Sequence, residues 1–110
     1  MTVRHLVLFS FPEGRDAAYL ERLTAGLEEL VAAVPDILEA SWGEDISGEE
    51  AHFDFALILD FADEAAYQRY RRHEAHRKFI ADYMREVAID KVRVRYVATG
   101  AAAAGRALRA

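Results

Sequence analysis

Cysteine is absent from this chain of 110 residues, which excludes disulfides, thiolate catalysis, iron–sulfur clusters and Cys-based zinc sites. No segment reaches the ~20 apolar residues that a membrane-spanning helix needs, and the start lacks the long apolar stretch of a signal peptide. Basic residues are in deficit: 14 Lys and Arg face 19 Asp and Glu, and the formal charge of −5 disfavours nucleic-acid binding. We therefore expect one cytoplasmic domain with neither a membrane nor a nucleic acid as partner.

Charge is concentrated in two blocks of the sequence. Residues 36–64 contain ten acidic side chains and no Lys or Arg, whereas residues 69–78 contain five basic side chains and one acid, Glu74. Such blocks usually form solvated faces of a protein. The alternative for the basic block is a local patch that attracts anions.

The apolar periodicity predicts a strand at residues 3–11, then an amphipathic helix that Asp16 caps and Pro35 ends, and a short strand at residues 37–42. Apolar and polar residues alternate in residues 52–61, which predicts another strand, and Asp63 can cap a helix after it. A second helical piece covers residues 73–84. The same alternation in residues 91–97 predicts the last strand. The order βαββαβ predicts an α+β, ferredoxin-like fold, a four-stranded antiparallel sheet with its helices on one face. We expect this domain to span residues 1–97 and the alanine-rich residues 98–110 to form a disordered tail.

The two faces of the predicted sheet are both apolar. The more apolar face should lie under the helices, and it carries Val7, Phe9, Phe53, Phe55 and Leu57. The opposite face carries Leu6, Leu8, Ile58 and, by our assignment, Trp42. Covering four large side chains is worth roughly 6–12 kcal/mol, comparable with the whole stability of a small domain, ~5–15 kcal/mol. A second copy of the chain is the simplest cover, so we predict a homodimer through this face.

Histidines are the first candidates for chemistry. His5 lies in the first strand, where it is either a core histidine with a backbone partner or a pocket base that titrates near neutrality. His73 and His76 are three residues apart and could share a metal, but His-Glu-Ala-His is not the His-Glu-x-x-His zinc signature. We therefore expect no metal site. His52 opens a strand beside the acidic loop and should be exposed.

Tyrosines accompany the second helical region. Tyr67, Tyr70 and Tyr83 fall on or near its inner face, where they can be core aromatics whose hydroxyls reach a partner. Alternatively, Tyr70 and His76 lean over a cavity above the sheet and meet His5. An imidazole in such a cavity could deprotonate a carbonyl compound.

Three blocks of the sequence resemble the stress-responsive A/B barrel (Dabb) family. They are the first strand, VRHLVLFSF at residues 3–11, the segment FDFALILDF at residues 53–61 with Asp63-Glu64-Ala65 after it, and YRRHEAHRKF at residues 70–79, which is similar to the family's tyrosine–HPAH segment. The resemblance covers residues 1–97. It implies a ferredoxin-like dimer whose two sheets close into an α/β barrel, with a pocket between sheet and helices in each subunit.

Some plant members of this family are polyketide cyclases, and the resemblance implies which residues would act in such an enzyme. A tyrosine and a histidine that match Tyr70 and His76 perform the acid–base work, and a strand histidine that matches His5 lines the pocket. Two departures stand out. A further pocket histidine of those cyclases falls at Phe55 here, and Glu74 replaces the motif's proline, near a helix start where its charge suits the dipole.

Two hypotheses of different class follow. The first is a non-catalytic or stress-related homodimer that binds a small, largely apolar carbonyl-type ligand without a cofactor. The second is a cofactor-independent cyclase, lyase or isomerase in which His76 is the base, Tyr70 orients it and His5 holds a carbonyl oxygen. A cofactor-free monooxygenase is a further alternative that rests on fold analogy. The expected ligand contacts are Val7, Phe9, Phe53, Phe55, Leu57, His73, Phe79 and Tyr83.

Overall fold

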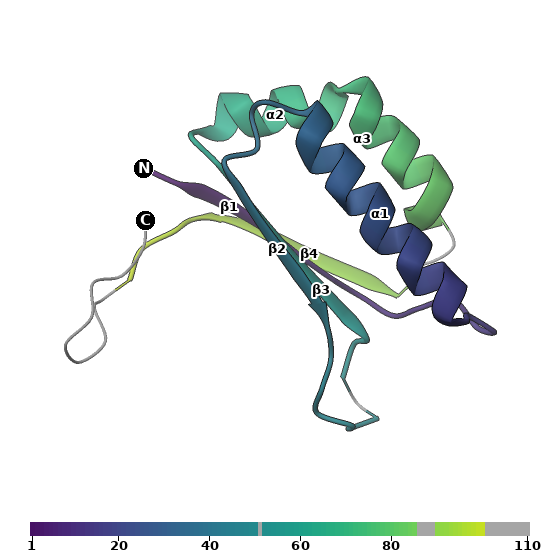
Figure 1. The fold of residues 1–110 in the computed structure, drawn as a ribbon. Helices are drawn as coiled ribbons and strands as arrows, with labels where there is room; N and C mark the ends of the chain where they lie inside the picture. The colour runs from purple at the N-terminus through teal and green to yellow at the C-terminus, as the bar shows by residue number, and fades with distance from the viewer. Residues whose placement is uncertain (51, 86–89, 101–110) are drawn as a thin grey trace.

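A computed structural model describes residues 1–50, 52–85 and 90–100 of the chain. The elements run β1 (Val3–Phe9), α1 (Ala17–Ala33), β2 (Glu39–Glu44), β3 (Phe55–Phe61), α2 (Glu64–Arg72), α3 (Glu74–Phe79), η1 (Ile80–Met84, a π-helical turn) and β4 (Lys91–Val97). The four strands form one antiparallel sheet in the order β2-β3-β1-β4, and the helices cover one of its faces (Figure 1). The predicted ferredoxin-like α+β fold is confirmed.

Side-chain caps begin the two longer helices where the sequence predicts them. Asp16 accepts a hydrogen bond from the backbone N–H of Tyr19 at 2.9 Å, and Asp63 accepts one from Ala66 at 2.8 Å. Each cap satisfies an N–H that has no partner within its helix. Helix α1 then buries Leu23, Leu27 and other residues at intervals of three and four against the sheet.

His73 separates α2 from α3. Its backbone is extended, with φ −67° and ψ 141°, and its N–H donates to the carbonyl of Tyr70 at 3.0 Å. Its ring Nδ1 accepts a hydrogen bond from the N–H of Ala75 at 3.0 Å, so the side chain caps α3. The break turns the chain between Tyr70 and His76, which therefore come from different helices.

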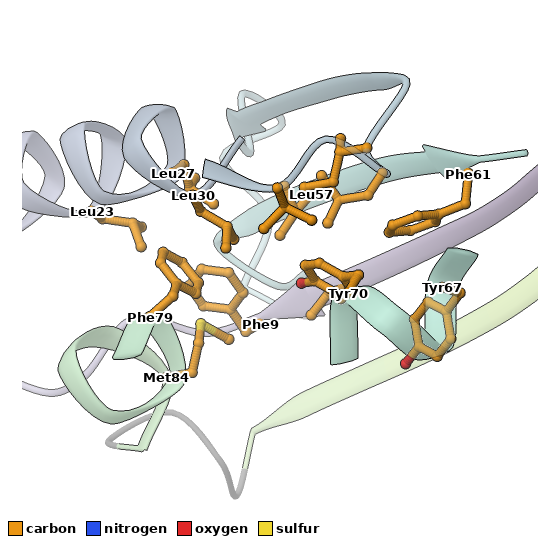
Figure 2. Packing of buried hydrophobic residues seen from close by; sticks show 14 of the residues in the cluster. Phe9, Leu23, Leu27, Leu30, Leu57, Phe61, Tyr67, Tyr70, Phe79 and Met84 are labelled. Atoms are coloured by element: carbon orange, nitrogen blue, oxygen red, sulfur yellow. The ribbon is translucent and has the colours of Figure 1, made fainter. Parts of the chain in front are cut away.

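The strand register decides which residues lie under the helices. His5 lies between Leu59 of β3 and Arg95 of β4, and Val7 lies between Leu57 and Arg93. These inner positions alternate with outer ones, as a pleated sheet requires. Figure 2 shows how the inner side chains of the sheet meet those of the helices in one core; the labelled side chains are Phe9, Leu23, Leu27, Leu30, Leu57, Phe61, Tyr67, Tyr70, Phe79 and Met84.

Three strand predictions differ from the structure at their ends. β1 stops at Phe9 rather than residue 11, β2 runs from Glu39 to Glu44 rather than over residues 37–42, and β3 begins at Phe55 rather than residue 52. The side chain of Asp54 accepts a hydrogen bond from the N–H of Phe11 at 2.8 Å, so a side chain replaces ladder pairing there. The last strand, at residues 91–97, is confirmed.

Trp42 lies on the other face of the sheet from the one predicted. It lies opposite Leu57 of β3 and packs against the core, so it belongs to the helix-covered face, and its placement on the open face is wrong. Without a known register the sequence could not fix its side, because a slip of one residue exchanges the two faces. Ser41, opposite Ile58, occupies the outer position instead.

The open face is nonetheless largely apolar. Leu6, Leu8 and Ile58 lie there half-buried. Strand β4 adds three side chains that were not predicted on this face: Val92, Val94 and Tyr96, which are 47%, 49% and 41% exposed. Arg4 and Asp60 form a two-pronged ion pair on this face, with N–O distances of 2.7 and 2.9 Å. No helix in the described part of the chain is long and apolar enough to cross a membrane. Most of the predicted tail, residues 101–110, lies outside the described residues.

Candidate functional site

A cavity of about 200 Å³ lies between the inner face of the sheet and the second helical layer. Its wall is aromatic and aliphatic, with two histidines and three cationic side chains among the apolar ones. The lining residues are His5, Val7, Leu57, Tyr67, Tyr70, Arg71, His76, Phe79, Ile80, Met84, Lys91 and Arg93. The wall thus combines apolar surface with a few polar groups, the usual composition of a small-molecule site.

Three separate elements bring the predicted acid–base residues to this cavity. β1 supplies His5, the last turns of α2 supply Tyr70, and α3 supplies His76. The ring centroids of Tyr70 and His76 are 4.6 Å apart, and His5 lies 5.1 Å from Tyr67 on the same helix as Tyr70. In Figure 2, Tyr70 lies over β1 within the cluster of buried side chains.

His76 has a defined tautomer when it is neutral. Its Nδ1 lies 3.0 Å from the backbone carbonyl oxygen of Arg71, which can only accept, so Nδ1 carries the hydrogen and donates. The lone pair is then on Nε2. Burial lowers the pKa of His76 below its usual 6.5, although the hydrogen bond to Arg71 works against this shift. His76 is therefore a neutral imidazole with a free acceptor nitrogen at physiological pH.

Tyr70 is a hydrogen-bond donor rather than a base. The side chain is 4% exposed, and burial, with Tyr67 nearby, raises the pKa of its hydroxyl well above the usual 10. Among the described residues its hydroxyl has no hydrogen-bond partner. A protonated, unpaired hydroxyl on the cavity wall is suited to holding a carbonyl oxygen of a ligand.

His5 is the more deeply buried of the two histidines at the site. Burial, followed by the charges of Arg95 and Arg93, lowers its pKa to about 4. Its Nδ1 is fully buried, and no described residue forms a hydrogen bond with it. His5 is thus neutral near pH 7, and its polar ring is held among apolar neighbours beside the cavity.

Strand β4 places a row of cations on the inner face, at the edge of the sheet. Arg95 forms an ion pair with Glu64 at 2.9 Å, and its guanidinium lies 4.1 Å from the ring centre of Tyr67. Lys91 and Arg93 line the cavity directly, and burial together with Arg93 lowers the pKa of Lys91. These residues are absent from the site predicted from the sequence, although the alternation Lys-x-Arg-x-Arg in KVRVRYV is a signal that places them on one face of a strand.

The expected ligand contacts divide into two groups. Val7, Leu57 and Phe79 line the cavity. The structure places the others elsewhere: Phe9 in the packed core, Phe53 and Phe55 beside a second hollow next to the β2–β3 loop, His73 at the cap of α3, and Tyr83 against Gly26 of α1. The break at His73 also separates it from His76.

Metal ligands do not converge in the described part of the chain. No group of three His, Asp or Glu side chains is arranged there to hold a metal ion. The polar groups of the cavity are two imidazoles, two phenols and three cations, which suit an organic ligand better than a divalent cation.

The chain is similar to proteins of one family over almost all of its described length. Residues 3–97 match the family described as Stress responsive A/B Barrel Domain, or Dabb. The Stress-response A/B barrel domain-containing protein HS1 from Arabidopsis thaliana is 31% identical over 94 residues, 84% of each chain.

Two solved structures illustrate the shared fold. A dimeric ferredoxin-like protein of unknown function from Thermobifida fusca has a TM-score of 0.79 and 28% identity, and the match covers 89% of this chain and 92% of that one. A hydroxynitrile lyase from Passiflora edulis has a TM-score of 0.81 at 17% identity, over 91% and 95% of the two chains. At that identity the likeness shows the fold alone. From the family match and the similarity to HS1, the chain belongs to the stress-responsive A/B barrel (Dabb) family.

Proposed function

We propose that this protein is a homodimer that binds a small, largely apolar carbonyl compound in the cavity of each subunit. The observation that carries the proposal is the convergence of His5, Tyr70 and His76, from three elements, on one partly apolar cavity. Drug-sized ligands usually occupy about 300–1,000 Å³, so a cavity of about 200 Å³ suits a smaller molecule. The free hydroxyl of Tyr70 would donate to its carbonyl oxygen.

The open face of the sheet supports the dimer. Val92, Val94 and Tyr96 extend an apolar surface that already contains Leu6, Leu8 and Ile58. A similar protein from Thermobifida fusca is dimeric. A charge placed at the centre of a buried apolar interface is strongly unfavourable, so Val94→Lys should yield a monomer.

Native mass spectrometry with added acetophenone tests both parts of this proposal. The expected species is a dimer with up to two molecules bound. Ile80→Trp places a larger side chain on the cavity wall and should abolish binding. Val31→Trp, at a similarly half-buried helical position that does not line the cavity, is the matched control and should retain it. A monomer would contradict the assembly, and binding that Ile80→Trp leaves unchanged would contradict the site.

A second candidate function is cofactor-independent proton transfer, and the tautomer of His76 favours it. With Nδ1 donating to the Arg71 carbonyl, Nε2 can accept a proton from the carbon next to a bound carbonyl group. Tyr70, 4.6 Å away between ring centres, would hydrogen-bond the oxygen that gains negative charge.

Hydrogen–deuterium exchange at the α-carbon of a small ketone, followed by NMR, tests this candidate. His76→Gln should lower the protein-catalysed rate about 100-fold or more, whereas His52→Gln, an exposed histidine away from the cavity, should not change it. Because the neutral imidazole is the base, the rate should rise with pH through a pKa below 6.5. A folded His76→Gln protein with the full rate would exclude His76 as the base.

A further inference from the structure

Strand β4 gives the cavity a local positive charge, although the net charge of the chain is negative. The inner positions of β4 are Lys91, Arg93 and Arg95, opposite Phe9, Val7 and His5 of β1. β4 is an edge strand, so these cations form one border of the helix-covered face. Helix α2 adds Arg71 from the other side of the cavity. Three cations, Arg71, Lys91 and Arg93, therefore line one cavity in a chain of net charge −5.

Most of this charge has no counter-ion. Glu64 pairs with Arg95, which lies outside the cavity lining. No acidic side chain lines the cavity within the described residues, and in that part of the chain Lys91, Arg93 and Arg71 form no ion pair. Other exposed cations do find partners, since Arg69 pairs with Asp36 at 2.8 Å and Lys78 lies 3.7 Å from Glu29. Exposed cations without an ion pair also occur elsewhere in the described residues, for example Arg22 and Arg72, but three of them, Arg71, Lys91 and Arg93, meet at the cavity.

The effect of these cations reaches the groups inside the cavity. Lys91 is half-buried, so its charge lacks part of its hydration as well as a partner. The same cations, acting after burial, help to keep His5 and His76 neutral. A negative charge bound beside Lys91 and Arg93 would compensate both effects, because it would restore a partner to the lysine and offset the repulsion on the imidazoles.

We propose that the cavity selects an anionic ligand, a small organic carboxylate whose charged end lies between Lys91 and Arg93 and whose apolar part lies against Tyr70 and Phe79. This inference rests on the proposed function and adds the charge of the ligand to it. An arginine binds a carboxylate through two parallel N–H groups, and a neighbouring lysine adds a point charge. The aromatic wall suits a planar apolar part.

Benzoate and benzamide provide the test, because they have nearly the same shape and differ in charge. Their affinities for the full-length protein can be measured by calorimetry or by ligand-observed NMR. The wild-type protein should prefer benzoate by roughly tenfold, and this preference should fall to about one in Lys91→Gln/Arg93→Gln. Arg22→Gln, which removes an exposed cation of α1 away from the cavity, is the matched control and should keep the preference.

A second measurement does not depend on a variant. Raising the salt concentration to about 0.3 M should weaken benzoate binding to the wild-type protein and leave benzamide binding unchanged, because salt screens charges. Equal affinity for the two compounds, or a preference that survives in Lys91→Gln/Arg93→Gln, would overturn the anion inference while leaving the proposed cavity function intact. Binding of neither compound would overturn both.

Discussion

Strands β3 and β4 flank β1 in the same sheet, yet their inner faces are used in opposite ways. The inner side chains of β3 are Phe55, Leu57, Leu59 and Phe61, all at most 4% exposed. The inner side chains of β4 include Lys91, Arg93 and Arg95, none of them buried. The β3 side chains belong to the packed core, whereas Lys91 and Arg93 of β4 border the cavity, which reaches across β1 to Leu57 of β3. One half of the sheet is therefore part of the packed core, and the other borders the cavity that we propose as the ligand site.

The strongest expected effect concerns the β3 side. Leu59 is completely buried, so Leu59→Ala removes core contacts and leaves a cavity, which should lower the free energy of unfolding by about 3–4 kcal/mol. Urea denaturation followed by circular dichroism measures this loss. A change below about 1 kcal/mol would mean that the β3 side is not the rigid half of the molecule.

His5 lies on β1, between the two halves, and should make stability depend on pH. Its pKa is about 4 in the folded protein and 6.5 as the ordinary value, so between these pH values the unfolded chain binds more protons. The free energy of unfolding should then fall as the pH drops from 6.5 to 4, by up to about 3 kcal/mol.

Thermal or urea unfolding at a series of pH values checks this dependence. Between pH 4 and 6.5 the free energy of unfolding should change less steeply with pH in His5→Gln than in the wild-type protein. In His52→Gln the wild-type dependence should persist, because His52 is exposed. If His5→Gln keeps the wild-type slope, another group causes it, and the buried neutral His5 described here is contradicted.

Substitution of Gly26 by alanine tests how closely helix α1 packs against the ring of Tyr83. A Cβ at this position would collide with the ring of Tyr83, with only 2.8 Å to its Cζ. Gly-to-Ala changes within helices normally stabilise by about 1 kcal/mol, but here the collision should outweigh that gain and leave a net loss of about 1 kcal/mol. Tyr83→Leu in the Gly26→Ala background should recover stability. Net stabilisation by Gly26→Ala alone would show that the ring moves aside at little cost.

The β4 side should tolerate truncation with the smallest effect on stability. Arg93 is exposed and has no ion pair among the described residues, so Arg93→Ala should change the free energy of unfolding by less than about 0.5 kcal/mol. The same urea experiment applies. A loss comparable with that of Leu59→Ala would mean that the β4 side belongs to the core rather than to a site.

The sequence was sufficient for the fold because its strongest signals are local. Alternation in residues 91–97, the caps Asp16 and Asp63, and helical spacing in α1 each act over a few residues and need no partner. Trp42 shows where this fails, since its side of the sheet depends on pairing Ser41 with Ile58, and pairing is set by the whole sheet.

The site was predicted only in part for the same reason. The resemblance to a family pointed to Tyr70, His76 and His5, which the structure gathers around one cavity. Lys91 and Arg93 were missed because alternation shows that they share a face with each other, but only the register with Val7 and Phe9 shows that this face is the inner one. His73 was expected beside His76, and the extended backbone at His73 directs it to a cap instead.

The four histidines allow the most direct test of the central claim, that the β4 side of the inner face is a ligand site. His5 and His76 line the cavity, whereas His52 lies in the β2–β3 loop and His73 caps α3. Titration with acetophenone, followed through the imidazole carbon-bound protons by NMR, should shift the signals of His5 and His76 saturably and leave those of His52 and His73 in place. Equal shifts of all four signals, or no shift of His5 and His76 at saturating ligand, would contradict the claim.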